Sequence, residues 1–225
     1  MIGPARFGRL LDLGMAVPLV LLMGSQVTGR AAHEWLGLAL FGMALAHQWL
    51  NRDWYARLPK GRYTARRAGA SVLALLLAAS MCLTVVTGIL MSGHVAPALA
   101  ASAGLNAIRR LHAAMSHWSF VLAALHFGLL WRRFTAPFTK TPGPPRRRVS
   151  VLRLIILLIL VCCALRLFVP AQYPDYMLFR VSFVFLDYER PWLHVVLENV
   201  CRFVVLVWLM ALCRGLGRKT NMNMP

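Results

Sequence analysis

The 225-residue chain is 59% hydrophobic and only 14% charged, with 25 Lys and Arg against seven Asp and Glu. An average soluble domain is about 25% charged, so this chain has too few charges to cover a water-soluble fold of its size. Its net charge of +18 would suggest nucleic acid as a partner of a soluble protein, but here the basic residues stand in blocks between apolar stretches. That pattern is typical of membrane-protein loops, so we expect the lipid bilayer as partner and no nucleic acid.

A membrane-spanning helix needs about 20 mainly apolar residues. Six segments meet this requirement: residues 10–29, 32–51, 68–92, 108–131, 150–169 and 192–213. We interpret the N-terminal run as an uncleaved first span and Gln26 to Arg30 as the loop that follows it. The sequence thus predicts an all-α integral membrane protein of six transmembrane helices.

A stretch rich in proline and arginine divides these spans into two groups. Such a stretch is unlikely to be helical, so we predict a cytoplasmic linker at residues 139–149. A four-helix core at residues 1–138 precedes it. A C-terminal two-helix unit at residues 150–225 follows it and includes an extracytoplasmic loop at 170–191.

The orientation follows from the Lys and Arg count of the loops. The two termini and every second loop lie on one side of the membrane and hold eighteen of these residues, whereas the loops on the other side hold six. Because cytoplasmic loops carry the excess of positive charge, both termini are predicted to be cytoplasmic. We accordingly expect a multi-pass protein of the bacterial inner membrane.

Two predicted spans carry matched pairs of histidines. His33 and His47 lie in the second span, His112 and His126 lie in the fourth, and both intervals are fourteen residues. Fourteen residues bring a helix to within about 40° of its starting direction and about 21 Å along its axis. Each helix therefore presents two imidazoles on one face, near opposite sides of the membrane.

The second and fourth spans run in the same direction, since two spans separate their starts. His33 is then level with His112, and His47 with His126. Two facing imidazoles at one level are the axial ligands that a b-type haem iron requires, so these four residues predict two haem b groups. No Cys-x-x-Cys-His sequence occurs for covalent haem attachment.

Small residues on the same helix faces fit this interpretation, because a flat macrocycle between two helices needs small side chains beside it. Small residues also mediate ordinary helix packing in membranes. Arginines near the two levels could pair with the haem propionates, although they are also ordinary flanks of a span. These cofactor-binding candidates are Gly37, Ala44, Ser116, Ser119, Ala123, Arg52, Arg109 and Arg110.

Other polar residues in or near the spans have no assigned role. His117 lies about 140° around the helix from His112 and is not expected to bind the same haem. His94 and His194 are expected at the outer interface. Glu198 and Arg202 are four residues apart, in the favourable order for an ion pair.

Thr28–Asn51, which contains His-Glu-Trp-Leu-Gly, and Arg110–Trp131 resemble the bacterial flavinylation-associated membrane cytochromes. The resemblance covers roughly residues 10–132 and implies a di-haem cytochrome b-like four-helix core. It further implies electron transfer between the quinone pool and an extracytoplasmic flavin- or haem-bearing redox protein. Members of that family often have a histidine where this chain has Leu130; the fourteen-residue interval favours His126 as the ligand.

Electron transfer is the leading interpretation, and the seven acidic residues form no close pair within a span that would suggest bond-making catalysis. Whether the chain belongs to an enzyme, such as a quinone or ferric oxidoreductase, depends on a site that the sequence does not locate. A proton- or metal-linked transporter and a membrane anchor subunit of a redox complex stay open as alternatives.

Overall fold

The fold was analysed in a computed structural model. It describes residues 4–100, 104–135, 172–181 and 189–220, together with the isolated positions 155, 156, 158, 159, 161, 162, 168 and 187. In this part of the chain the regular structure is helical, with no β-strand. The predicted linker 139–149 and most of the predicted span 150–169 lie outside the described residues.

Five long helices and three short ones make up the described fold. In chain order they are α1 (Pro4–Leu22), α2 (Ser25–Leu50), α3 (Arg52–Arg57), α4 (Ala65–Leu90), the 3₁₀ helix η1 (Pro97–Leu99), α5 (Leu105–Thr135), α7 (Tyr173–Met177) and α8 (Trp192–Thr220).

Three of the helices are long and apolar enough to cross a membrane. Over their most apolar windows, α4, α5 and α8 have mean hydropathies of 2.4, 1.4 and 2.1. Large apolar side chains such as Val72, Leu75 and Leu76 of α4 are exposed, as expected for a lipid-facing surface. The chain is thus helical and suited to a bilayer, and the predicted helices at 68–92, 108–131 and 192–213 are confirmed within a few residues.

The first two predicted segments are also helical, and the break between them lies only partly where it was predicted. The chain turns at Met23 and Gly24 instead of at residues 26–30, and α2 already begins at Ser25. A Cβ atom at Gly24 would lie 3.4 Å from Val195 of α8, an ordinary van der Waals distance, so this turn lies beside α8. Within α2, Gly29 has φ 70° and ψ 166° and interrupts the helical geometry.

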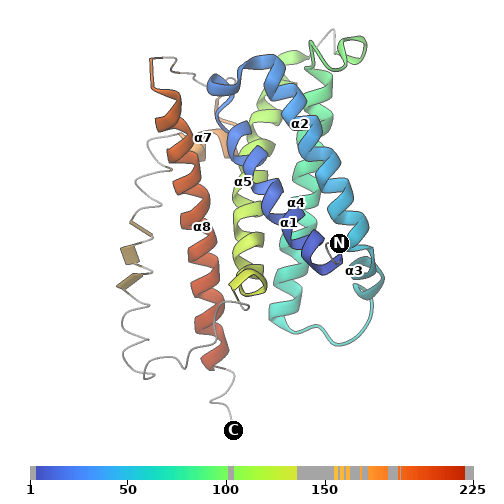
Figure 1. The fold of residues 1–225 in the computed structure, drawn as a ribbon, viewed down its shortest axis with the longest axis vertical. Coiled ribbons are helices and arrows are strands. Elements are labelled where there is room, and N and C mark those ends of the chain that lie inside the picture. Colours follow the sequence, from blue (N-terminus) through green and yellow to red (C-terminus); the bar gives the residue numbers. More distant parts are fainter. Residues whose placement is uncertain are drawn as a thin grey trace.

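The long helices lie side by side in one bundle (Figure 1). α1 and α4 run in one direction, and α2, α5 and α8 run in the other (Figure 1). We refer to the two ends as the α3 end and the η1 end, after the short helices there. α2 and α5, which carry the histidine pairs, are therefore parallel, as the sequence predicts.

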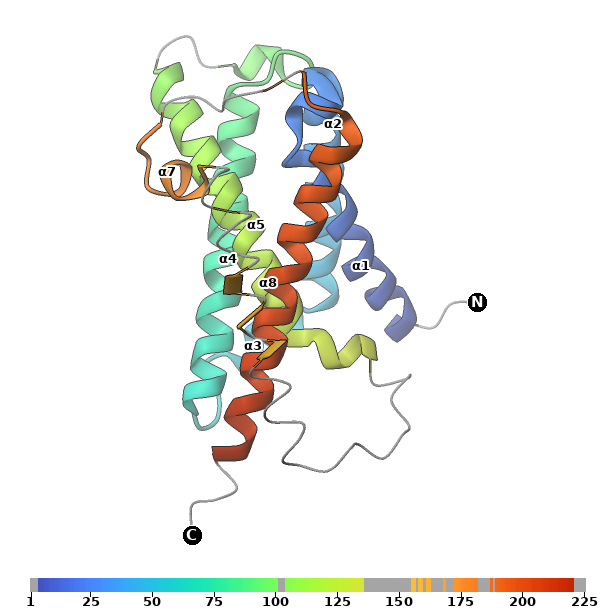
Figure 2. The same cartoon turned by 90° about the vertical axis from the view of Figure 1, so that its left-hand side faces the viewer.

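Packing within the bundle is uneven. α4 and α8 pack closely against α5, and α1 packs closely against α2, whereas direct contact of α2 with α4 is slight and with α5 slighter still. α7 packs on α5 towards the η1 end (Figure 2). One cluster of buried apolar side chains joins α1, α2, α5, α7 and α8: Leu19, Val20, Leu40, Phe120, Ala124, Tyr173, Phe203 and Val207.

Candidate haem-binding site

The rings of His33 and His112 meet between α2 and α5. Their centroids are 6.4 Å apart, and the ring planes are inclined at 65°. Helices in direct contact have axes about 8–10 Å apart, and α2 and α5 make too little contact for that. The two imidazoles therefore approach each other across a space wider than ordinary helix packing leaves.

Hydrogen bonds from α4 fix the protonation of His112. Its Nδ1 lies 3.1 Å from the hydroxyl of Thr87 and 3.0 Å from the carbonyl oxygen of Thr84. The Thr87 hydroxyl donates to the carbonyl of Leu83, 2.6 Å away, so its oxygen accepts from Nδ1. Because both partners accept, the proton of the neutral ring sits on Nδ1, and Nε2 keeps the lone pair that a metal needs.

Gly88 of α4 leaves room for the same ring. A Cβ atom at Gly88 would lie 3.3 Å from Cε1 and 3.7 Å from Nδ1 of His112, which is tight contact.

The facing histidine on α2, His33, has a buried Nδ1 that has no hydrogen-bond partner among the described residues. A buried polar atom without a partner is costly, which marks this place as one where a further group is expected.

The second pair lies nearer the α3 end. Nδ1 of His47 is 2.7 Å from a carboxylate oxygen of Asp12 on α1, and both side chains are partly buried. A carboxylate accepts, so His47 carries its proton on Nδ1 and leaves Nε2 free, as at His112. His126 lies within electrostatic range of both His47 and Asp12, and its buried Nδ1 also has no described partner.

The small residues predicted beside the macrocycles are of two kinds: glycine and alanine, which make no side-chain hydrogen bond, and serine, whose hydroxyl does. A Cβ atom at Gly37 would meet nothing within 4 Å, so this position borders open space. Ala44 and Ala123 are both partly buried, and Ala123 packs against the core. Ser116 donates to the carbonyl of its own helix at His112, and Ser119 donates to Ser80 of α4, so their hydroxyls are already engaged.

The predicted propionate partners lie at the two ends of the bundle. At the η1 end, Arg109 is exposed and Arg110 donates to the carbonyl of Phe179, 2.6 Å away. At the α3 end, the Arg52 guanidinium lies 4.8 Å from the centre of the Trp49 ring. None of these contacts brings an arginine to a histidine pair, so their role towards a cofactor stays a prediction.

His117 faces away from His112, as predicted. Its buried ring stacks on Tyr176 with a centroid distance of 4.7 Å and meets Tyr173 edge-on at 4.6 Å. Its Nδ1 donates to the carbonyl of Ala113, 2.7 Å away, on its own helix. His117 therefore joins α5 to α7.

Glu198 of α8 holds the predicted ion pair with Arg202 at 2.9 Å. The same carboxylate also contacts Arg190 at 2.7 Å and His194 at 3.1 Å. Arg202 is buried and bonds to Asn199 as well, so its charge is compensated within the helix. These contacts suit a structural role.

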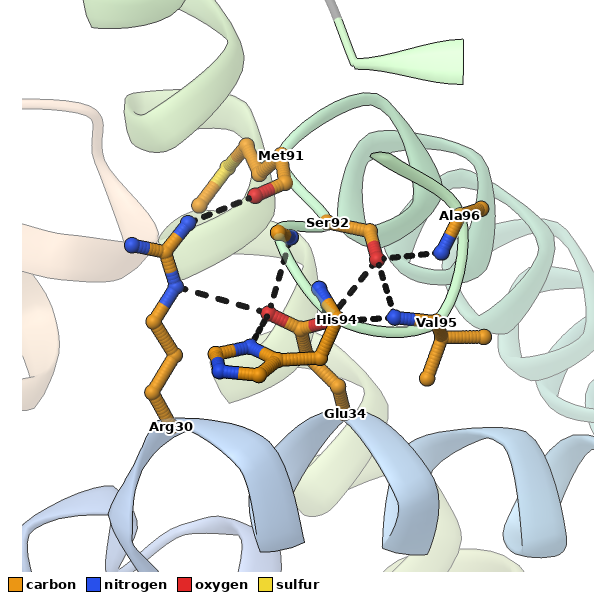
Figure 3. A network of polar contacts seen from close by, with 8 residues as sticks. Arg30, Glu34, Met91, Ser92, His94, Val95 and Ala96 are labelled. Carbon is orange, nitrogen blue, oxygen red and sulfur yellow. Dashed lines mark hydrogen bonds and ion pairs between the residues drawn. The ribbon is translucent and has the colours of Figure 1, made fainter. Parts of the chain in front are cut away.

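Glu34, the residue after His33, fastens the segment between α4 and η1 to α2 (Figure 3). Its carboxylate accepts from the Ser92 hydroxyl and from three backbone N–H groups, those of Gly93, His94 and Val95, at 2.8–3.1 Å. Arg30 reaches the same carboxylate at 3.4 Å and donates to the carbonyl of Met91 (Figure 3). The turn of α2 that carries His33 is thereby held against the end of α4.

The residues present fit a haem at the pair of His33 and His112. Two imidazoles bound to one metal ion at about 2.0–2.1 Å would have ring centroids roughly 6–6.5 Å apart, close to the spacing of His33 and His112. Within the described residues, no group of three or more His, Cys, Asp and Glu side chains is placed to hold a metal ion. A two-histidine site suits an ion whose other ligands come with the cofactor.

Sequence reasoning missed the residues that support the histidines. Asp12 could have been noticed as a lone acid in an apolar helix, which is by default a functional candidate. No such signal marks Thr84, Thr87 or Gly88, since hydroxyl and small residues are common in spanning helices.

Comparison of the chain with protein-family models, with curated proteins and with solved structures found no match in any of the three.

Proposed function

We propose that this chain is a membrane electron-transfer protein that binds two b-type haems, one between His33 and His112 and one between His47 and His126. The observation that carries the proposal is the spacing of His33 and His112. Their rings stand at a spacing suited to one metal ion between them, and the His112 ring is oriented by α4 so that Nε2 is available.

The chain's own residues would supply ligation, orientation and a dry environment. Thr84 and Thr87 hold the His112 ring, and Asp12 holds the His47 ring, as outer-shell partners do in metal sites. Apolar helices around both levels exclude water and lower the local dielectric. A haem, when bound, supplies reversible one-electron chemistry, whose potential depends on these ligands and surroundings.

The membrane orientation that we propose rests on the charge distribution, and the partners that we propose rest on the resemblance. The positive-inside rule puts the α3 end, with Arg52, Arg57, Arg66 and Arg67, in the cytoplasm, and six spans put both termini there. The pair of His33 and His112 then lies near the extracytoplasmic side of a bacterial inner membrane, and we call it the outer pair. The pair of His47 and His126 lies nearer the cytoplasmic side, and we call it the inner pair. Quinone and an extracytoplasmic flavin- or haem-bearing protein are the partners we propose.

An absorption spectrum of the purified protein, oxidised and then reduced, tests the proposal. We expect the bands of low-spin haem b and about two haems per chain by haem extraction. His33→Ala and His126→Ala should each remove about half of the haem. His194→Gln is a matched control, because His194 is exposed and belongs to neither pair.

A colourless, monodisperse protein from haem-replete cells would overturn the proposal. So would a full haem complement in the His33→Ala and His126→Ala variants. Reduction of the bound haem by a quinol in detergent then tests the quinone link separately.

A further inference from the structure

A cavity of about 250 Å³ opens at the α3 end, where α4, α5 and α8 meet. The start of α4, the last turns of α5 and the end of α8 form its walls. Six of the residues that line it are Thr64, Arg66, Arg67, Leu129, Leu130 and Arg214. Three guanidinium groups and two leucines therefore share one opening between helices.

The positive charge of this cavity is not neutralised by the hydrogen bonds of Arg67 and Arg214. Arg67 donates to the carbonyls of Arg57 and Arg62, at 2.6 and 3.3 Å, and Arg214 donates to the carbonyl of Leu129. Carbonyl oxygens accept hydrogen bonds without bringing a net negative charge. In addition, Nε of Arg214 is buried and has no hydrogen-bond partner among the described residues.

The sequence offers few acids to compensate these arginines. Asp53 is the only Asp or Glu between Glu34 and Asp175, and none follows Glu198. No acidic residue lines the cavity. An anion from outside the chain is therefore the natural counter-charge.

We propose that this cavity binds the phosphate-bearing head group of an anionic phospholipid. The three arginines provide the fork-shaped donors that phosphate prefers, and Leu129, Leu130 and the apolar face of α4 lie where acyl chains would run. Basic cavities between spanning helices at the charge-rich side of a membrane bind such head groups. The inference is independent of the haem proposal.

Native mass spectrometry of the full chain in detergent tests this site. After delipidation, dioleoyl phosphatidylglycerol should rebind and raise the melting temperature more than dioleoyl phosphatidylcholine or inorganic phosphate at equal concentration. Replacing two charge-assisted contacts in Arg66→Gln/Arg214→Gln should weaken phosphatidylglycerol binding about tenfold or more. Arg62→Gln is the matched control, because Arg62 lies in the loop just before α4 but does not line the cavity.

Equal binding of phosphatidylglycerol and phosphatidylcholine would overturn the proposal. Equal affinity of the wild-type chain and the double variant would do the same. A melting shift by inorganic phosphate as large as that by the lipid would assign the cavity to free phosphate and overturn the lipid site. Arg66→Gln alone repeats the comparison without touching the Arg214 bond to α5, in case the double variant fails to fold.

Discussion

The imidazole of His47 is hydrogen-bonded through Nδ1 to the carboxylate of Asp12, 2.7 Å away, across the interface of α1 and α2. An acid placed there orients the ring, fixes its tautomer and increases the basicity of Nε2. α1 thus contributes to the inner histidine pair although it carries no histidine.

Asp12→Asn should weaken the inner haem selectively. Loss of such an outer-shell partner typically costs 10–100-fold in metal affinity, so we expect a lower haem content with the outer haem retained. Haem extraction and redox titration measure this. Asp53→Asn is the control, because Asp53 is exposed on α3, and it should change neither the haem content nor the redox titration. An unchanged inner haem in Asp12→Asn would show that the carboxylate does not support His47.

Gly88→Val should displace the His112 ring and reduce the outer haem alone. A Cβ atom at Gly88 already lies 3.3 Å from this ring, and valine adds two methyl groups beyond it. The comparison is Gly69→Val on the same helix, where a Cβ atom meets nothing within 4 Å. Both variants cost similar helix propensity, so equal haem loss in the two would contradict a steric effect at His112.

Thr87→Val should loosen the orientation of His112 without removing a ligand. One hydrogen bond is lost while the Thr84 carbonyl still accepts, so we expect a loss of about 1 kcal/mol in stability of the haem-loaded protein. Thermal unfolding followed at the haem band measures this. Thr87→Ser keeps the hydroxyl and should behave as the wild type; equal melting of the Val and Ser variants would argue against the hydrogen bond.

Glu34→Gln should destabilise the η1 end. The amide keeps the shape of the side chain but loses the negative charge that accepts three backbone N–H groups and the Ser92 hydroxyl. Hydrogen bonds to a charged group are worth about 1.5–3 kcal/mol each, so a fall in melting temperature is expected. Glu189→Gln, at an exposed position, serves as the reference and should leave the melting temperature unchanged.

The sequence predicted what depends on a single helix. Hydropathy located α4, α5 and α8, and the fourteen-residue intervals with parallel helices placed His33 level with His112. It could not predict which neighbours face a given ring. Thr87 reaches His112 only because α4 packs beside α5, and Asp12 reaches His47 across 35 residues of chain.

Boundaries also depended on contacts that hydropathy does not report. The turn expected at residues 26–30 lies at Met23 and Gly24, beside Val195 of α8, and a kink at Gly29 falls within the expected range. α1 and α2 carry Asp12, Arg30 and Glu34 in otherwise apolar surroundings, and each of these charges has a partner in the fold. Their membrane crossing, like the haem ligation itself, stays a prediction.

The uneven packing of the bundle has a consequence for how its two halves are held together. α1 with α2, and α4 with α5, form two helical hairpins that are close-packed internally but touch each other sparsely. Each hairpin contributes one histidine to each pair. On the proposed function each cofactor would therefore join the two hairpins, in addition to the shared buried cluster and the contacts of Glu34, and we expect haem binding to strengthen their association.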